Sequence, residues 1–410
     1  MDTDSQKMPK EQYDKIIKEI LDFVDQFTQV GKNNSNDLTS TFEANHNEWF
    51  KVVPFMQDCE LYAEGLTKYI TAIDLNPTDT QLFNAASYIS EFEEYKYSGH
   101  EYLINLFHNL GIAWHHLGTI YDNYAIEAFK KSIFYIIGMS SHEAFSPTCY
   151  SFRKCSTYLY QALIEEQINL SSPVTFNDPF DSPIIALLDN NDEISMLFRT
   201  AYLSCIKIAC FVCNVMQPFY KNSGNIYGEI VRDKQKRENN VPEYQNELMW
   251  SHYADYHKGI CIKYHFQNSL TNLYATSDTS VRYFKDVEYK EDLSVLNLKD
   301  SIAIKDAFFV KSKEWEYENE LRLLQYDLNA KGDYDTINVP GSIEAIYFGV
   351  RCPQKEIESI KKIMEGRKFV TETTKIVNNK RQYVKDEQFI HFFQMVFDSK
   401  KFGSLSAVQI

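Results

Sequence analysis

The chain has 410 residues, 44% of them hydrophobic, which is enough to bury a sizeable core and indicates two or three domains. Its formal net charge of -15 argues against bulk nucleic acid as the main partner, although local basic patches remain compatible with that charge. The first ten residues lack the apolar core of a secretory signal, and no later run approaches the roughly 18 apolar residues of a membrane span. We therefore expect a soluble, cytoplasmic protein with no membrane partner.

Residues 10–140 are almost free of Gly and place large apolar residues three or four positions apart, which predicts successive amphipathic helices. Residues 109–118, followed by Ala125, Phe129 and Ser132, resemble a tetratricopeptide repeat, in which small residues let two helices approach. Residues 65–77 resemble the end of a second, degenerate copy. We predict a helical-repeat domain over residues 1–145 that binds a protein partner; a plain helical bundle is the alternative.

The pattern changes at residues 146–150, after which short β-branched or aromatic runs alternate with helical ones, so residues 146–410 are predicted to form one α+β domain of catalytic size. The polar segment 221–242 is expected to be a mobile insertion. Strands are predicted over residues 168–172 (a sheet edge before Pro173), 206–215, 259–266, 322–327 and 343–348, and helices over 158–167 and 353–366.

The loop at residues 176–181 holds two acids and an Asn around a proline, between two aromatic residues. Asn and Asp stabilise turns through neighbouring backbone amides, so a rigid corner is one interpretation. The other is that Asn177, Asp178 or Asp181 lines a pocket and binds a ligand by hydrogen bonds.

Residues 248–262 place aromatic and imidazole side chains directly before a predicted strand. No H-E-x-x-H motif or paired C-x-x-C accompanies them, and we expect no metal. The functional interpretation is that His252 or Tyr253 forms hydrogen bonds to a ligand. The alternative is that Tyr253, like Trp250, is buried and has only a structural role.

Residues 315–322 carry Glu316, Glu318, Glu320 and Arg322 at intervals of two, and in a strand all four would share one face. Like charges at this spacing repel unless a cation, a partner or a polyhydroxylated ligand meets them. This segment is therefore the leading active-site candidate, with a solvated strand or the first turn of a helix as the alternative. Arg322 is expected to keep neighbouring carboxylates ionised by lowering their pKa.

Several familiar chemistries lack their motifs in this chain. There is no G-x-x-x-x-G-K-[ST] phosphate loop, no G-x-S-x-G elbow and no G-x-G-x-x-G fingerprint. Kinases, hydrolases of the elbow type and Rossmann enzymes are therefore not expected.

Five segments together resemble a bacterial family known as domain of unknown function 2971, over about residues 148–370. Tyr150 and Arg153 stand where that family often has Tyr-Lys-Tyr-Arg, with the middle lysine replaced by Ser151. The five segments are residues 170–181, 210–211, 249–262, 311–322 and 346–352.

The order of these segments is also similar, more remotely, to that of ADP-ribosyltransferases. This resemblance implies a split sheet, with Arg153 holding the phosphates of NAD and Tyr253 or His252 orienting its nicotinamide. It also implies that Glu318 or Glu320 stabilises the positive charge that develops at the anomeric carbon, a role for which a fixed carboxylate is suited.

These features predict an NAD-using enzyme that transfers ADP-ribose to a macromolecule or hydrolyses NAD, as a toxin or defence effector regulated through its helical repeats. A nucleic acid would enter only as a target. Two other classes stay open. One is an adaptor that binds a protein and a small ligand without chemistry. The other is a nuclease whose acids, with Asp178 and Asp181 as a second cluster, hold Mg²⁺.

Overall fold

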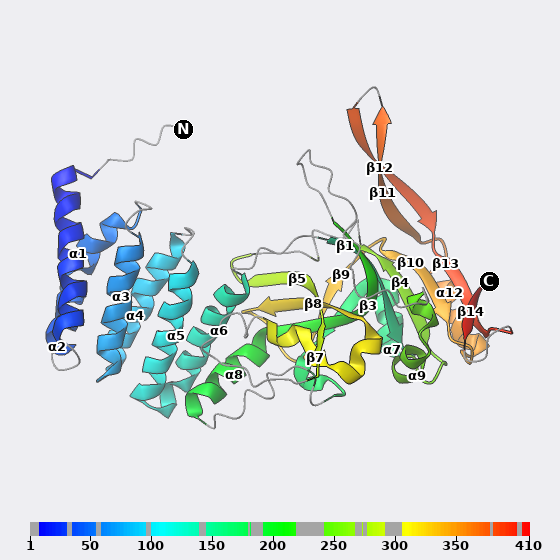
Figure 1. Ribbon diagram of the computed structural model, residues 1–410, viewed down its shortest axis with the longest axis horizontal. Helices are drawn as coiled ribbons and strands as arrows, with labels where there is room; N and C mark the ends of the chain where they lie inside the picture. Colours follow the sequence, from blue (N-terminus) through cyan, green and yellow to red (C-terminus); the bar gives the residue numbers. More distant parts are fainter. Residues whose placement is uncertain are drawn as a thin grey trace. The chain divides into compact units, whose positions relative to one another are not determined.

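A computed structural model gives the arrangement of the chain (Figure 1). It describes residues 8–30, 35–54, 59–95, 100–138, 145–178, 181, 192–218, 242–266, 273, 277–291, 306–377, 380–399 and 404–410. Two compact units divide the chain. Unit 1 comprises Met1–Ser140, Leu187–Leu203 and Leu298–Lys305, and unit 2 comprises Ser141–Ala186, Ser204–Asn297 and Asp306–Ile410.

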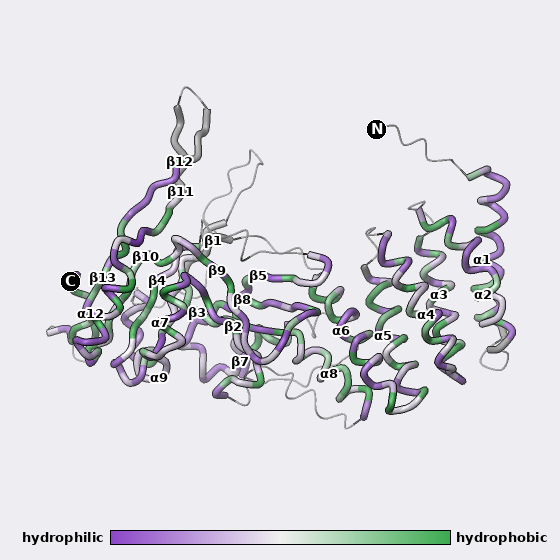
Figure 2. The backbone as a smooth tube through the Cα atoms, turned by 180° about the vertical axis from the view of Figure 1, so that it is seen from behind, coloured by the Kyte–Doolittle hydropathy of each residue, from purple (hydrophilic) through white to green (hydrophobic). Residues whose placement is uncertain are grey.

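Unit 1 is helical, as the three-and-four spacing predicts, and Figure 2 shows hydrophobic and hydrophilic residues alternating along its helices. Its helices are α1 (Lys10–Val30), α2 (Ser35–Trp49), α3 (Cys59–Asp74), α4 (Asp79–Glu94), α5 (His100–Leu117), α6 (Asp122–Gly138) and most of α8 (Glu193–Cys205). Thr78 caps α4 by accepting from the backbone N–H of Gln81. No helix in the described ranges is long and apolar enough to cross a membrane.

Two glycines show how closely the helices of unit 1 pack. A Cβ on Gly111 of α5 would lie 2.6 Å from the ring of Phe129 on α6, so only glycine fits there. Gly65 of α3 lies against Ile20 and Phe42, and the Phe42 ring stacks on Tyr69 with centroids 4.7 Å apart. Close approach at Gly111 therefore sets the spacing of α5 and α6, whereas at Gly65 a Cβ would make ordinary contacts, the nearest at 3.5 Å from Ile20.

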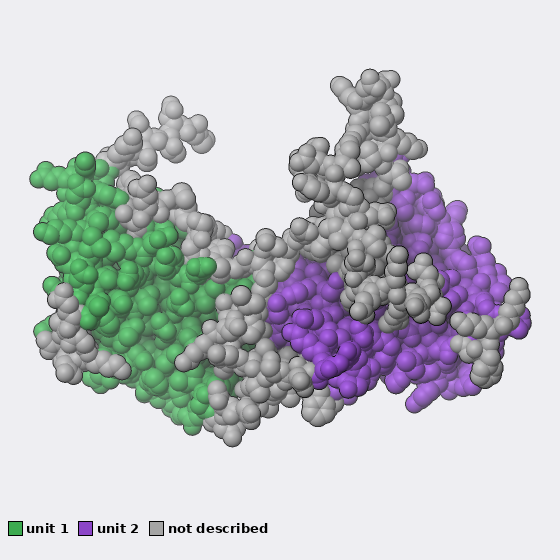
Figure 3. All heavy atoms as spheres, viewed as in Figure 1, with its two compact units in different colours: residues 1–140, 187–203, 298–305 green, residues 141–186, 204–297, 306–410 purple. Residues whose placement is uncertain are grey.

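Unit 2, coloured purple in Figure 3, is built on a ten-stranded mixed sheet. Its strands are β1 (Phe145–Arg153), β2 (Gln167–Ser171), β3 (Ile206–Pro218), β4 (Ile260–His265), β5 (Ser280–Asp286), β8 (Glu320–Asp327), β9 (Tyr334–Asn338), β10 (Ile343–Phe348), β13 (His391–Phe397) and β14 (Leu405–Gln409). All described pairings in this sheet are antiparallel except β10 with β13.

The sheet branches at β3, whose Val212 pairs with Tyr150 of β1 on one edge and with Glu320 of β8 on the other. From β1 the sheet continues through β4 and β10 to β13 and β14, and from β8 it continues to β5. The expected edge strand near Pro173 is β2, but β2 lies between β3 and β9, so its predicted edge position is wrong.

Alternating residues on these strands divide the core of unit 2 into two layers. One layer contains Phe211 and Leu321 and is covered by α7 (Thr157–Glu165) and α12 (Gln354–Ile363) through Leu163 and Ile360. The opposite layer contains Val212 and is covered by α9 (Glu247–Tyr253). Glu320 and Arg322 belong to this second face, because Leu321 between them faces the first.

Two further strand pairs complete unit 2: β6 (Glu288–Lys290) with β7 (Val310–Ser312), and β11 (Lys368–Val377) with β12 (Lys380–Phe389). The β11–β12 ribbon pairs rung by rung from Lys368–Phe389 to Val377–Lys380 and projects from the sheet in Figure 1. The remaining strand and helix predictions match β3, β4, β8, β10, α7 and α12 within a few residues. The expected mobile insertion at 221–242 lies, apart from Pro242, outside the described residues.

Candidate functional site

The segment before β8 is a 3-10 turn and not a strand. Lys313–Glu318 forms a 3-10 helix, and Asn319 follows in the left-handed region at φ 46°. Asn319 is held there because its side chain donates to the carbonyl of Cys213 at 2.9 Å. The predicted common strand face is therefore wrong for Glu316 and Glu318, and Glu316 is exposed. Glu318 nevertheless reaches Glu320, because the turn folds it back toward the start of β8.

Arg322 lies at the centre of the site and is fully buried. Its Nε and Nη2 donate to the two oxygens of Glu320 at 2.8 and 2.9 Å, and Nη2 also donates to the carboxylate of Asp181 at 2.7 Å. Its Nη1 donates to the carbonyl of Phe308 at 2.8 Å. These bonds offset the cost of burying a guanidinium, because Nε, Nη1 and Nη2 each have a hydrogen-bond acceptor.

Lys311, a residue that the sequence patterns did not single out, is the second buried cation. Its Nζ lies 2.7 Å from Glu318, 3.2 Å from Asp181 and 3.6 Å from Glu320. We refer to Asp181, Lys311, Glu318, Glu320 and Arg322 as the buried charge cluster; it holds three carboxylates and two cations. The cluster unites the acidic corner at residues 176–181 with the Glu-x-Glu-x-Arg segment, which the sequence left as separate candidates.

Glu318 and Glu320 have pKa values shifted in opposite directions. Burial opposes ionisation of Glu320, but the charges of Arg322 and Lys311 outweigh it and lower the pKa of Glu320 to about 2. Burial raises the pKa of Glu318, and the charge of Lys311 only partly offsets this. The cluster therefore holds one permanently ionised carboxylate beside one that takes up a proton more readily.

Three hydroxyl or thiol groups surround these glutamates. Tyr253, at the end of α9, donates to Glu318 at 2.5 Å, and burial followed by the charge of Glu318 raises the pKa of Tyr253. The hydroxyl of Tyr289 accepts from the backbone N–H of Glu320 at 2.8 Å. Cys210 on β3 donates its S–H to Glu320, which helps to keep that carboxylate ionised. Tyr289 and Cys210 were not among the predicted site residues.

The loop at residues 176–181 contributes through two of its members. The ring of Phe176 lies 5.7 Å from the guanidinium carbon of Arg322, and Asp181 supplies its carboxylate. Asp178 accepts from the backbone N–H of Asp181 at 3.0 Å, closing the turn that directs Asp181 inward. Asn177 is exposed. The corner is thus both a turn and part of the cluster.

The remaining predicted residues divide between the two faces of the sheet. Tyr150 pairs with Val212, which pairs with Glu320, and these three share one face. Arg153 alternates with Phe152 and lies on the opposite face, where its Nε donates to Ser151 at 3.1 Å. His252 is exposed and packs near the rings of Trp315 and Tyr317. The structure therefore brings Tyr150 and Tyr253 to the face of Glu320, but not Arg153.

Within the described ranges, no group of three or more His, Cys, Asp and Glu side chains is arranged to hold a metal ion. The three carboxylates of the cluster are bound to Arg322 and Lys311 instead. The arrangement can place a fixed negative charge and a proton acceptor next to each other under a sheet face lined by Tyr150 and Tyr253.

Comparison with known proteins gives one finding. No curated protein and no solved structure matches the chain. Residues 249–323, which hold most of α9, β4, Lys311 and the segment from Glu318 to Arg322, match the model of a family described as protein of unknown function (DUF2971). This segment is therefore similar to that family, and it supplies every member of the buried charge cluster except Asp181.

Proposed function

We propose that unit 2 is an enzyme of the ADP-ribosyltransferase type, which cleaves the bond between nicotinamide and ribose in NAD and passes ADP-ribose to a macromolecule or to water. The observation that carries the proposal is the Glu318–Glu320 pair, two glutamates with opposite pKa shifts in one buried cluster. Such pairs divide the roles of anion and proton acceptor between two carboxyl groups.

Glu320 supplies the electrostatic part of the reaction. Cleavage of an N-glycosidic bond passes through a cation-like ribose, which a fixed carboxylate stabilises. The Glu320 carboxylate stays ionised because Arg322 and Lys311 hold its pKa near 2. Arg322 also fixes its position through two bonds. The anion is therefore present and oriented before the substrate arrives.

Glu318 supplies the proton acceptor. Its raised pKa makes it a better base than an ordinary glutamate for the hydroxyl of an acceptor or of water. Tyr253 orients it at 2.5 Å, and Tyr253 with Tyr150 offers aromatic surface on the face of Glu320 for the nicotinamide ring. Arg153 has no part in this proposal, because it lies on the other face of the sheet.

Unit 1 is proposed to be a tetratricopeptide-like module that binds a protein and thereby regulates unit 2, as in a toxin or defence effector. The contact of Gly111 with Phe129 supports this proposal, because the repeat pairs a small residue on one helix with a large one on the next. Such helix pairs present binding surfaces.

The test is release of nicotinamide from NAD, followed by chromatography, with the purified chain alone and with a cell extract as source of acceptors. Glu320→Gln is expected to lower the rate by about 100-fold or more, and Glu318→Gln by about 10- to 100-fold. Glu316→Gln is the matched control, because Glu316 is exposed in the same turn and should leave the rate unchanged.

Circular dichroism of each variant separates loss of activity from loss of folding. The proposal fails if the wild-type chain leaves NAD intact under both conditions. It also fails if a folded Glu320→Gln variant releases nicotinamide at the wild-type rate.

A further inference from the structure

The charge of the chain is distributed unevenly, and one segment has the opposite sign to the rest. Residues 351–385 contain ten Lys or Arg and only four Asp or Glu, whereas the whole chain has 42 basic and 57 acidic residues. This segment forms α12, β11 and half of β12. A basic segment in an acidic protein is the electrostatic signature of a surface for a polyanion.

Helix α12 turns part of this charge outward. Its apolar side, with Ile357 and Ile360, packs into the core of unit 2. Lys355 and Lys362 are exposed, and Lys361 is half-buried beside them. The helix therefore presents lysines to solvent next to the start of the β11–β12 ribbon.

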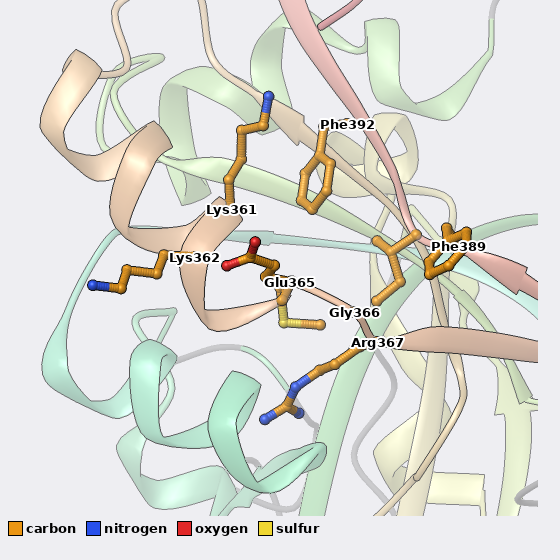
Figure 4. Close-up of a pocket in the computed structure, with 9 residues that line it drawn as sticks. Lys361, Lys362, Glu365, Gly366, Arg367, Phe389 and Phe392 are labelled. Carbon is orange, nitrogen blue, oxygen red and sulfur yellow. The ribbon is translucent and has the colours of Figure 1, made fainter.

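A pocket of about 410 Å³ lies where α12, the start of β11 and the end of β12 meet (Figure 4). Buried Met364 and Ile390 and half-buried Phe392 give it an apolar lining, and Phe389 stands at its edge with 63% of its surface exposed. An exposed phenylalanine beside a pocket of this size suits a flat ring that stacks on it.

Lysines accompany both rings. The Nζ of Lys361 lies 5.6 Å from the ring centroid of Phe392, and the Nζ of Lys368 lies 5.4 Å from that of Phe389. This alternation of cation and aromatic ring is the pattern of surfaces that bind a base and its phosphates together.

Not every charge near the pocket is available to an anion. The guanidinium of Arg367 donates to the carbonyls of Leu163 and Ile164 at 2.8 Å each. Arg367 lines the pocket, but its N–H groups are therefore engaged by the protein. Lys368 lies 3.3 Å from Glu387, and the exposed Glu365 also lines the pocket. Lys361 and Lys362 therefore carry most of the attraction for a phosphate.

We propose that this surface, made of Lys355, Lys361, Lys362, Phe389 and Phe392, binds single-stranded nucleic acid. The backbone phosphates meet the lysines of α12, and an unpaired base enters the pocket against Phe389. A single strand is favoured over a duplex, because a base inside a duplex has no free face to stack on a side chain. The surface shares no residue with the buried charge cluster and does not depend on the proposed cleavage of NAD.

The experiment measures fluorescence anisotropy of a labelled 12-nucleotide oligo-U and oligo-dT with the full chain, without NAD, between 50 and 200 mM KCl. About three phosphate contacts give a slope of log K against log salt near -2. The double variant Lys361→Glu, Lys362→Glu is expected to lose at least about 10-fold in affinity and to flatten the slope. Phe389→Ala is expected to lose about 5- to 100-fold while keeping the slope.

The matched control is Lys15→Glu with Lys331→Glu, which makes the same change of net charge at exposed lysines that are not part of this surface and should bind like the wild type. If the Lys361 substitution perturbs folding by circular dichroism, Lys362→Glu alone tests the same contact. Glu320→Gln should bind normally, which separates this inference from the proposed activity. The inference is overturned if the wild type binds neither oligonucleotide at 50 mM KCl, if it prefers the corresponding duplex, or if the charge-reversed variants bind like the control.

Discussion

In unit 1 a buried polar contact joins the imidazole of His46 to the hydroxyl of Tyr62 at 2.9 Å, whereas in unit 2 the buried contacts join Arg322 and Lys311 to three carboxylates. Burial lowers the pKa of His46 to about 4, so His46 is neutral at pH 7, and its acidic neighbour Glu91 is half exposed. Unit 1 thus buries neutral groups and leaves the charge near the surface. Unit 2 buries the charges themselves.

The two kinds of buried polar contact differ in the free energy that burial costs. A neutral hydrogen bond costs little to bury, whereas a buried ion pair costs more to desolvate than it returns unless every charge has a partner. The helices of unit 1 need no more than their packing to explain His46. The five ionisable groups of the buried charge cluster fit the proposed reaction, which needs an oriented charge.

The largest effect is expected from Arg322→Met. This change leaves the buried carboxylates of Glu320 and Asp181 without their main partner, which costs about 3 to 5 kcal/mol. Hydrogen exchange followed by mass spectrometry reports the units separately, and protection should fall in β3 and β8 but not in α2 and α3. His46→Phe is the comparison in unit 1 and should cost only about 1 to 2 kcal/mol. Wild-type protection of β8 in Arg322→Met would break the contrast between the units.

The second effect is the order in which the units lose stability in acid. The folded pKa of His46 lies below its usual value of 6.5, so the unfolded state binds more protons and unit 1 loses about 3 kcal/mol as the pH falls from 6.5 to 4. Glu320 has a folded pKa of about 2 against 4.5, so unit 2 loses a similar amount, about 3 kcal/mol, but between pH 4.5 and 2. Glu318 has the opposite effect, because its pKa is raised in the folded state. The stability that Glu318 contributes is present at low pH and is lost as the pH rises through its folded pKa.

Protection factors measured at pH 7, 5 and 3 should therefore fall first in α2 and α3 and later in β8. His46→Phe should remove the early loss and Glu320→Gln the late one. A simultaneous loss in both units, unchanged by either substitution, is the result that this account does not allow.

The smallest effects are expected from two matched hydroxyl deletions. Tyr62→Phe removes a bond between neutral groups and should lower the free energy of unfolding by about 1 kcal/mol. Tyr253→Phe removes a bond to a carboxylate and should cost about 1.5 to 3 kcal/mol, while raising the pKa of Glu318 further. Urea denaturation of both variants gives the comparison, and a larger loss in Tyr62→Phe would reverse it.

Local patterns in the sequence predicted the helices of unit 1 within residues 10–140 and five strands of unit 2, but not β1, β5–β7, β9 or β11–β14. The β-branched and aromatic run at 343–348 coincides with β10, and Pro353 stands directly before α12, as its fixed φ favours. Alternation was misleading at residues 315–319. Trp315, Tyr317 and the glutamates between them alternate as in a strand, but Asn319 takes a left-handed conformation that ends the turn.

The site was predictable where its charges are close in sequence and not where they are distant. The spacing of Glu318, Glu320 and Arg322 identified them as candidate site residues, and the Asn- and Asp-containing loop identified Asp181. Lys311 carries no local signal, because its partners come from residue 181 and from the turn that follows it. The face to which Arg153 belongs depends on the register of β1 with β3 and β4, which one strand's residues do not reveal.

The β11–β12 ribbon has a consequence for how this protein can vary in length. Its ten rungs form a separate two-stranded sheet, and within the described residues its strands add no rung to the ten-stranded sheet. Removing two residues from each strand would shorten the ribbon and keep every remaining side chain on its own side, because side chains alternate with a period of two. The outer part of the ribbon is therefore a natural place to insert or trim sequence by design.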